Sequence, residues 1–356
     1  MLLSLFIVLN ARGADTSDIE AQLITHRNKL YYPNAVESFY KHRGFRLAWI
    51  APDTVNTHVW DAMLLLDCVV QYGLDHSDYH PDELLYDELH KLVKQADKAH
   101  NVQSALYDVM LTDAVIAFIN NLHYGRLNPV WTSGRIDRKE TTGFSAENIL
   151  ANAINQKDFK SVIIGVQPKS QSYKSLQYQM YLVTGLYTGD CYETPESVIR
   201  LMAVNMERLR WVNGSSNNSI AINIPSNSLS YYTKDTVYTF KAGNVSHLAL
   251  GYPLTEFTIS NGIVLLHQTN NTLSFPVEGR QLIKGDLISV HNAGKLASLL
   301  VGHPVNKHVN RLYKLPRPMP LHVTYYTCEM RNGVLITYHD TRYLDGQLEK
   351  ALYHLK

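Results

Sequence analysis

The stretch that decides the fold runs from Val198 to Ile224 and reads VIRLMAVNMERLRWVNGSSNNSIAINI. Apolar residues recur in its first half at helical spacing, which predicts an amphipathic helix that ends near Trp211. The Asn-, Gly- and Ser-rich segment 213–218 indicates a turn or short linker. From Ile220 onwards, apolar and polar residues alternate as in a half-buried strand. The hydrophobic period thus changes from about 3.6 to about 2 residues, which predicts a helical region followed by a mainly β region.

The residues before this stretch carry helical patterns. Residues 60–72 and 104–122 are apolar on most faces, and each segment is followed within three residues by a glycine, Gly73 or Gly125. A helix of this kind belongs in the middle of a bundle. Residues 78–83 contain a proline and acidic side chains, which are typical of the first turn of a helix. We therefore expect a further helix to begin there.

The residues after 218 carry strand and hairpin patterns. Residues 229–232 and 237–242 are expected to pair across a turn, and Asn332-Gly333 predicts a tight hairpin turn. Two more strands are expected at 263–266 and 321–327, and one short helix at 296–301. The predicted fold class is α+β, with a helical bundle over residues 15–211 and a β domain over 212–356.

The N-terminal residues resemble a secretory signal peptide. Residues 2–9 (LLSLFIVL) are apolar, and the small-residue segment 11–14 follows them. The run is too short to span a bilayer, which needs about 20 apolar residues, and we expect no second apolar stretch to be long enough for a span. We expect residues 1–14 to be a signal-like segment of an exported protein without a membrane span. The alternative is a buried N-terminal strand or helix.

Composition narrows the classes of partner. The 33 basic and 32 acidic residues give a net charge of +1, which provides no electrostatic footprint for nucleic acid or a membrane surface. The 16 histidines do not cluster at metal-ligand spacing. The three cysteines, Cys68, Cys191 and Cys328, are too few and too scattered for a disulfide framework or metal site. We expect no metal and no cofactor, and we interpret Cys68 and Cys328 as core thiols.

Several stretches together resemble the large murein L,D-transpeptidases, which join a helical scaffold domain to a YkuD-type catalytic domain. The most specific is NMERLRW at residues 205–211, similar to the family's N-L-E-R-x-R-W. The other stretches, in chain order, are FYKHRGFRLAW (39–49), GLDHSDYH (73–80), LTDA (111–114), YGRLNP (124–129), INIP (222–225), PLHVTYYT (320–327) and DTRYLD (340–345). The resemblance implies a scaffold domain followed by a reduced YkuD-like β domain.

Two departures from the family concern segments that are too short. Residues 167–193 leave no room for the small peptidoglycan-binding module that these enzymes commonly carry in the scaffold. Only 25 residues separate Lys241 from His267, where the family has a capping element over its active site. The resemblance therefore implies fewer strands or a more open site than in active relatives.

The family's reaction is acyl transfer through a cysteine thioester, which needs a thiolate, a histidine base and oxyanion donors. The family supplies them in an H-x-T strand followed by S-H-G-C-x-R. His267 and Thr269 match the first motif, and anchoring on Arg280 upstream and Asn292 downstream aligns residues 284–289 with the second. In that alignment the nucleophile position is Leu287.

The other two chemical positions are also changed. Gly285 stands at the base position and Ser289 at the arginine position. A chain that has lost both base and nucleophile keeps only binding, so no catalytic residue is predicted. His267, Thr269 and Arg280 are the predicted binding residues. The alternative for His267 is a histidine whose hydrogen-bonding groups are paired inside a strand and which has no functional role. A relocated site at Cys328 is a second alternative, but His322 lies too far along the strand to serve it.

Three hypotheses about function remain open. The first is a catalytically inactive envelope protein that binds or scaffolds, with peptidoglycan stem peptides or envelope proteins as partners. The second is an active L,D-transpeptidase or hydrolase with a rearranged site, and the third is a structural β domain without a ligand. Acylation by a carbapenem separates the first two, because carbapenems acylate the nucleophilic cysteine of this family.

Overall fold

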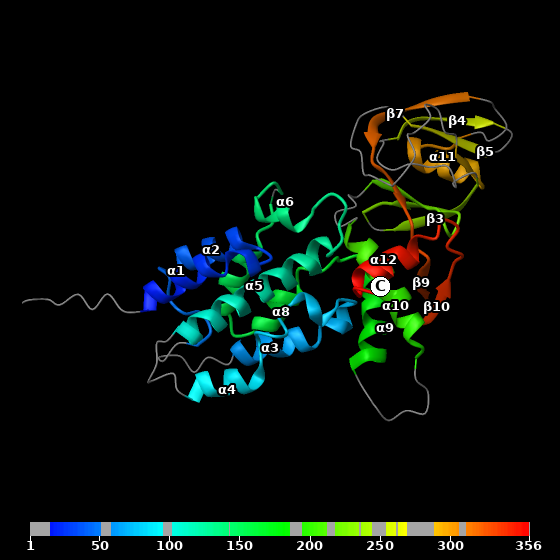
Figure 1. Cartoon of the computed structure of the whole chain (residues 1–356). Coiled ribbons are helices and arrows are strands. Elements are labelled where there is room, and N and C mark those ends of the chain that lie inside the picture. The colour runs from blue at the N-terminus through cyan, green and yellow to red at the C-terminus, as the bar shows by residue number, and fades with distance from the viewer. Residues whose placement is uncertain are drawn as a thin grey trace, which may run out of the picture. The chain divides into compact units, whose positions relative to one another are not determined.

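The computed structural model describes residues 15–50, 58–94, 102–141, 143–185, 194–211, 218–234, 236–243, 254–260, 263–268, 288–305 and 311–355. The chain is α+β, with helices up to residue 211 and, after it, strands interspersed with short helices (Figure 1). The signal-like segment 1–14 and Cys191 lie outside the described residues. What the sequence predicts for them stays a prediction.

The chain divides into two compact units. The first comprises residues 1–70, 75–122 and 133–167, and the second comprises 71–74, 123–132 and 168–356. The helices after residue 168 thus belong to the same unit as the strands. The predicted boundary at 211 and 212 followed the change of hydrophobic period, whereas these units follow contacts between residues, so that boundary stays a prediction.

The first unit is built from helices around one central helix, α5. Figure 1 shows α5 running through the middle of this unit, and its apolar side chains from Val109 to Leu122 are almost wholly buried. Its helices are α1 (Asp15–Thr25), α2 (Pro33–His42), α3 (His58–Asp67), α4 (Tyr86–Lys94), α5 (Val102–Tyr124), α6 (Ser133–Asp137), α7 (Ala146–Ile154) and α8 (Phe159–Ile164). Single 3-10 turns occur at Arg27–Lys29 and His76–Asp78.

Helix α5 is also long and apolar enough to cross a membrane by length and composition. The interpretation of the sequence overlooked this. Within its most apolar 18-residue window, 83% of the residues are buried inside the protein, which is typical of a core helix. The absence of a membrane span stays a prediction.

Two helix predictions in this region were wrong in detail. The helix expected to start at 78–83 begins instead at Tyr86. Residues 81–83 form only a turn, in which the N–H groups of Glu83 and Leu84 both bind the carbonyl oxygen of His80, whose own φ is 52°. The helix predicted at 60–72 ends at Asp67 and continues as a 3-10 turn, Val69–Tyr72, that stops at Gly73.

The second unit contains helices α9 (Gln171–Gly185), α10 (Glu196–Trp211), α11 (Ala293–Val301) and α12 (Leu344–Leu352). Its strands are β1 (Ser219–Asn223), β2 (Ser228–Tyr232), β3 (Val237–Gly243), β4 (Leu254–Ser260), β5 (Ile263–Gln268), β6 (Ile288–Val290), β7 (Arg311–Met319), β8 (Leu321–Thr324), β9 (Cys328–Arg331) and β10 (Val334–Thr337). The short helix predicted at 296–301 and the predicted pairing of β2 with β3 are confirmed.

The described strands form two sheets. The larger has the order β7-β4-β5-β6-β3-β2-β1-β8, and β9 pairs with β10 in the smaller. All neighbours are antiparallel except β1 and β8, which run parallel and place Ile222 beside Val323. The hairpin predicted at Asn332-Gly333 joins β9 to β10, and both residues have positive φ, as a tight hairpin turn requires.

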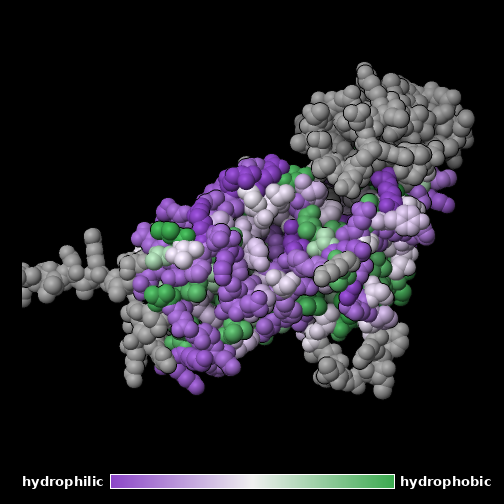
Figure 2. Space-filling view, in the orientation of Figure 1, coloured by the Kyte–Doolittle hydropathy of each residue, from purple (hydrophilic) through white to green (hydrophobic). Residues whose placement is uncertain are grey.

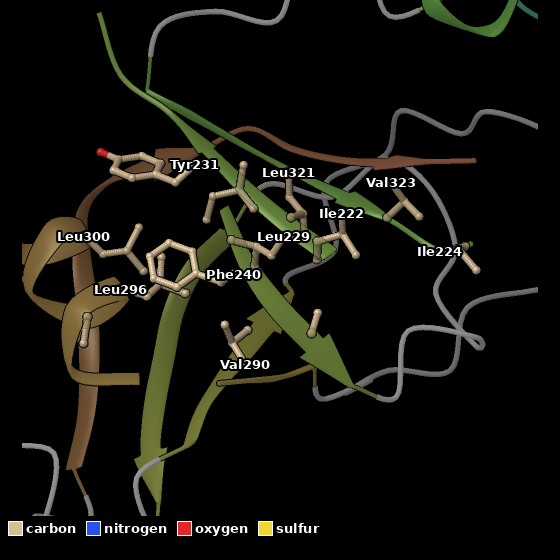
Figure 3. Close-up of a cluster of buried hydrophobic side chains, with 13 residues drawn as sticks. Ile222, Ile224, Leu229, Tyr231, Phe240, Val290, Leu296, Leu300, Leu321 and Val323 are labelled. Carbon is tan, nitrogen blue, oxygen red and sulfur yellow. The ribbon is translucent and has the colours of Figure 1, made fainter. Parts of the chain in front are cut away.

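One face of the larger sheet carries the apolar core of this part of the unit. Alternate residues of β1, β2, β3 and β8 form one buried cluster that also contains Leu296 and Leu300 of α11 (Figure 3). Full burial of each such side chain stabilises the fold by about 1.5–3 kcal/mol. The alternation seen in the sequence from Ile220 to Ile224 is thus the alternation between this core and the opposite face.

Hydrophilic residues predominate on the face shown in Figure 2, and the hydrophobic ones lie there in separate patches.

Candidate functional site

The segments that the resemblance assigned to a ligand site are neighbours in the larger sheet. Strand β5, which contains His267, pairs with β6. Leu266 lies opposite Ile288 in this pairing. These two residues directly precede His267 and directly follow Leu287 in the sequence. The backbone of His267 pairs on its other side with Glu256 of β4.

The remaining predicted site residues lie outside the described residues: Thr269, Arg280, Gly285 and Leu287. The side chains of His267 and Ser289 are also outside them, although both backbones belong to strands. The structure therefore brings two segments of the predicted site together. The roles of the individual side chains stay predictions.

The two described cysteines are poor nucleophiles. Cys328 is 1% exposed, and its Sγ lies 3.8 Å from the carbonyl oxygen of Leu201. Burial raises the pKa of the Cys328 thiol to about 12. Burial also raises the pKa of the Cys68 thiol. A thiolate is the reactive form of cysteine, so neither residue supplies one at neutral pH.

Among the described residues, His322 makes no hydrogen bond to Cys328, whose Sγ contacts the carbonyl oxygen of Leu201 instead. His322 lies on β8 of the larger sheet, whereas Cys328 begins β9 of the smaller sheet. Burial lowers the pKa of the His322 imidazole, which keeps it neutral. Its Nε2 is buried and has no hydrogen-bond partner among the described residues.

The junction motif 205–211 lies on α10 and is a centre of hydrogen bonding in the second unit. Asn205 accepts a hydrogen bond from the backbone N–H of Thr327 at 2.8 Å and donates to the Thr327 hydroxyl at 3.0 Å. Asn223 binds the preceding residue, because its Oδ1 accepts from Tyr326 N–H at 2.7 Å and its Nδ2 donates to the Tyr326 carbonyl at 3.0 Å. The strand predicted at 321–327 therefore ends at Thr324, where these side chains replace strand pairing.

Glu207 joins this motif to the segment 124–129. Its carboxylate accepts hydrogen bonds from the backbone N–H groups of Arg126 at 3.2 Å and Leu127 at 2.7 Å. It also accepts one from the indole of Trp211 at 2.9 Å. The turn can approach so closely because residue 125 is glycine, with a φ of 86°.

The two arginines of the motif, Arg208 and Arg210, form ion pairs in the same unit. Arg208 pairs with Asp345 at 2.5 Å. Arg210 lies 3.3 Å from Glu207, donates to the Tyr173 hydroxyl at 3.0 Å and donates to the Tyr72 carbonyl. The charged residues of the most specific motif therefore hold the second unit together. Sequence reasoning recognised the motif without seeing this role.

A second set of buried polar groups lies on α5. Asp113 accepts hydrogen bonds from the N–H groups of Tyr31 at 2.8 Å and Tyr32 at 2.9 Å, and it pairs with His80 Nε2 at 2.7 Å. This histidine–carboxylate pair is buried. Because the Asp113 oxygens already bind the backbone of another segment, the pair fixes the fold and does not resemble an accessible acid–base pair.

Asp108 likewise fixes the backbone at the end of the 39–49 stretch. It accepts from the N–H groups of Ala48 and Trp49 at 2.8 Å each, from Ile50 N–H at 3.2 Å and from the Tyr40 hydroxyl at 2.6 Å. None of the sequence patterns described above points to Asp108. The available signal was its position as a carboxylate inside an apolar helix, because a buried carboxylate must be paired.

A metal centre has no support in the described part of the chain. No group of three or more His, Cys, Asp or Glu residues there could hold a metal ion.

The comparison with protein families matches a portion of the helical region. A family model described as Scaffold domain matches residues 34–180. This range begins in α2, contains Asp108 and Asp113, and ends inside α9. No curated protein gives a significant match. The chain thus contains a helical scaffold domain, as the resemblance implied.

Proposed function

We propose that this chain is a catalytically inactive homologue of the large murein L,D-transpeptidases that binds or scaffolds in the cell envelope. Its partners are peptidoglycan stem peptides or envelope proteins. The protein is exported, and its signal-like segment 1–14 is removed. No nucleic acid, cofactor or metal takes part.

The observation that carries this proposal is the Scaffold domain match over residues 34–180. In the family that the chain resembles, this domain accompanies a catalytic domain with a cysteine nucleophile, and here the aligned position is Leu287. The scaffold is therefore retained while the nucleophile is not. A binding role follows, because leucine offers no atom that can form a thioester.

The thiol chemistry supports the same proposal. A relocated transpeptidase site would need a thiolate beside a base. Cys328 is buried and protonated, and His322 lies on another sheet. Binding without acyl transfer requires neither group.

The direct test is cosedimentation with purified peptidoglycan sacculi. The full-length protein should pellet with intact sacculi, and soluble muropeptides released from the same sacculi should compete. The heat-unfolded protein is the control for non-specific adsorption. Failure to pellet, or pelleting that muropeptides leave unchanged, would contradict binding to stem peptides.

Localisation is tested separately by fractionation of cells that express the full chain. The mature protein should be outside the cytoplasm and begin near Ala14 or Asp15. Recovery of the uncleaved chain in the cytoplasm would contradict export.

A further inference from the structure

A cavity of about 520 Å³ opens in the first unit between α2, α5 and the segment that joins α6 to α7. Tyr32 and Ala35 line it from the α2 side, and Asn120 lines it from α5. Asp137 and Glu147 line it from the ends of α6 and α7. The volume is in the range of small-molecule sites, which is roughly 300–1,000 Å³.

Asn120 is the polar group in this cavity that has no explanation in the fold. Its side chain is 2% exposed, and its Oδ1 is buried without a hydrogen-bond partner among the described residues. The adjacent Asn121 differs, because its amide donates to the Tyr79 hydroxyl at 3.0 Å. A buried acceptor without a donor is unfavourable and uncommon in native proteins. An N–H or O–H group of a ligand would satisfy it.

The charged side chains of the cavity favour a cation. Asp137 and Glu147 are acidic, and Lys139 is the basic residue among the lining side chains. Lys139 pairs with Glu147 at 3.0 Å. Among the described residues, the hydrogen bonds that Asp137 accepts come from neutral backbone N–H groups, those of Asn34 at 3.1 Å and Ala35 at 2.9 Å. One negative charge therefore remains without a cation in the cavity lining.

A second cavity of about 240 Å³ lies next to the first and shares Glu147 and Asn148 with it. Arg43 and Arg46 line this second cavity. The Nε of Arg43 is buried and has no acceptor among the residues that the structure describes. Within the same part of the chain, neither guanidinium is paired with a carboxylate. The second cavity thus offers cationic donors where the first offers an acceptor and negative charge.

We propose that these two cavities form one site for a short zwitterionic peptide. The ammonium group of the peptide donates to Asn120 Oδ1 beside Asp137, and its carboxylate binds Arg43 and Arg46. This inference deepens the proposed function by naming a ligand class. Only the origin of the peptide, from peptidoglycan stems, rests on the proposed function.

The test is isothermal titration of the full-length protein with alanylalanine as the probe. N-acetyl-alanylalanine and alanylalanine amide are the matched controls, because each removes one charge and keeps the rest of the ligand. Each control should bind about tenfold more weakly or worse, as expected for the loss of a charge-assisted hydrogen bond. Equal binding of the N-acetyl control would overturn the ammonium assignment, and no heat at millimolar alanylalanine would overturn the site.

Variants separate a ligand site from a structural role. Asn120→Leu removes the unpaired acceptor and should leave the melting temperature unchanged or higher, while alanylalanine binds about tenfold more weakly. Asn121→Leu is the control and should show the opposite pattern, a lower melting temperature and unchanged affinity. Arg46→Gln should weaken binding of alanylalanine but not of its amide. An Asn120→Leu variant that is destabilised and binds normally would show a structural role instead.

The outcome is distinguishable from that of the proposed function. Peptide binding without binding to sacculi would leave this site standing and contradict the envelope role. Binding to sacculi that is unaffected by Asn120→Leu, together with no response to alanylalanine, would contradict the site alone.

Discussion

The guanidinium of Arg210 lies 3.3 Å from the carboxylate of Glu207, and both side chains are wholly buried. Each partner also binds backbone from a distant part of the sequence: Glu207 holds Arg126 and Leu127, and Arg210 holds Tyr72. The charges are thus enclosed together with the segments they organise. Removing one partner leaves the other charge buried without compensation.

Glu207→Gln should therefore lower the free energy of unfolding by about 3 kcal/mol or more. The measurement is chemical denaturation followed by circular dichroism. The double variant Glu207→Gln/Arg210→Met is the control and should recover part of this loss, because it removes the isolated charge. A single substitution that costs less than about 1 kcal/mol would show that the pair is open to solvent.

Gly125→Ala should also destabilise the second unit. Residue 125 has a φ of 86°, and a Cβ there would lie 2.6 Å from Glu207 Oε1. Gly302→Ala is the matched control, since its φ is 77° and a Cβ would meet nothing within 4 Å. The control should cost about 1–2 kcal/mol for the left-handed backbone alone. Thermal unfolding should show a clearly larger loss for Gly125→Ala, and equal losses would contradict the close packing.

Cys328 should resist alkylation in the native protein. Its pKa of about 12 leaves almost no thiolate at neutral pH. The measurement uses a Cys68→Ala/Cys191→Ser variant, in which Cys328 is the remaining thiol. Iodoacetamide should label it roughly a thousandfold more slowly than a free thiol and at the normal rate in denaturant. Fast labelling without denaturant would revive Cys328 as a candidate nucleophile.

His322 should make the stability depend on pH in the acidic range. Its folded pKa lies below the unfolded value of about 6.5 because burial disfavours the charged imidazole. Below that value the unfolded chain binds a proton that the folded chain does not, so stability falls as the pH is lowered. His322→Leu should gain stability relative to the wild type as the pH falls from 7 to 5 in parallel denaturant titrations. A constant difference would show that His322 does not contribute.

Restoring the aligned cysteine should not restore transpeptidation. A Leu287→Cys thiol would have Gly285 at the position of the base, so its pKa should stay near the free value of about 8.5. General base assistance is worth roughly 10²–10⁴ in rate, and oxyanion donors contribute a similar amount. Mass spectrometry should find neither cross-linked stem-peptide dimers nor a carbapenem adduct, for wild type or variant. Turnover by the wild type would overturn the inactive assignment, and rapid turnover by the variant would overturn the alignment.

The sequence by itself determined the local structure. The period change after Trp211 separated helices from strands, because a helix face and a strand face bury side chains at different spacings. The hairpin at Asn332-Gly333 could be predicted for a different reason, because Asn and Gly tolerate positive φ. The Scaffold domain could also be predicted, because each motif that carries the resemblance is a contiguous stretch of sequence.

Only the tertiary structure decided what the buried polar residues do. Asp108 and Glu207 each bind backbone that lies some 60 to 80 residues away, and no local period encodes such a partner. The same holds for Asn120, which interrupts an apolar helix in the sequence but faces a cavity in the fold. A hydrophobic pattern records which face of an element is buried. The partner of a buried polar group is fixed only when distant segments come together and water is excluded.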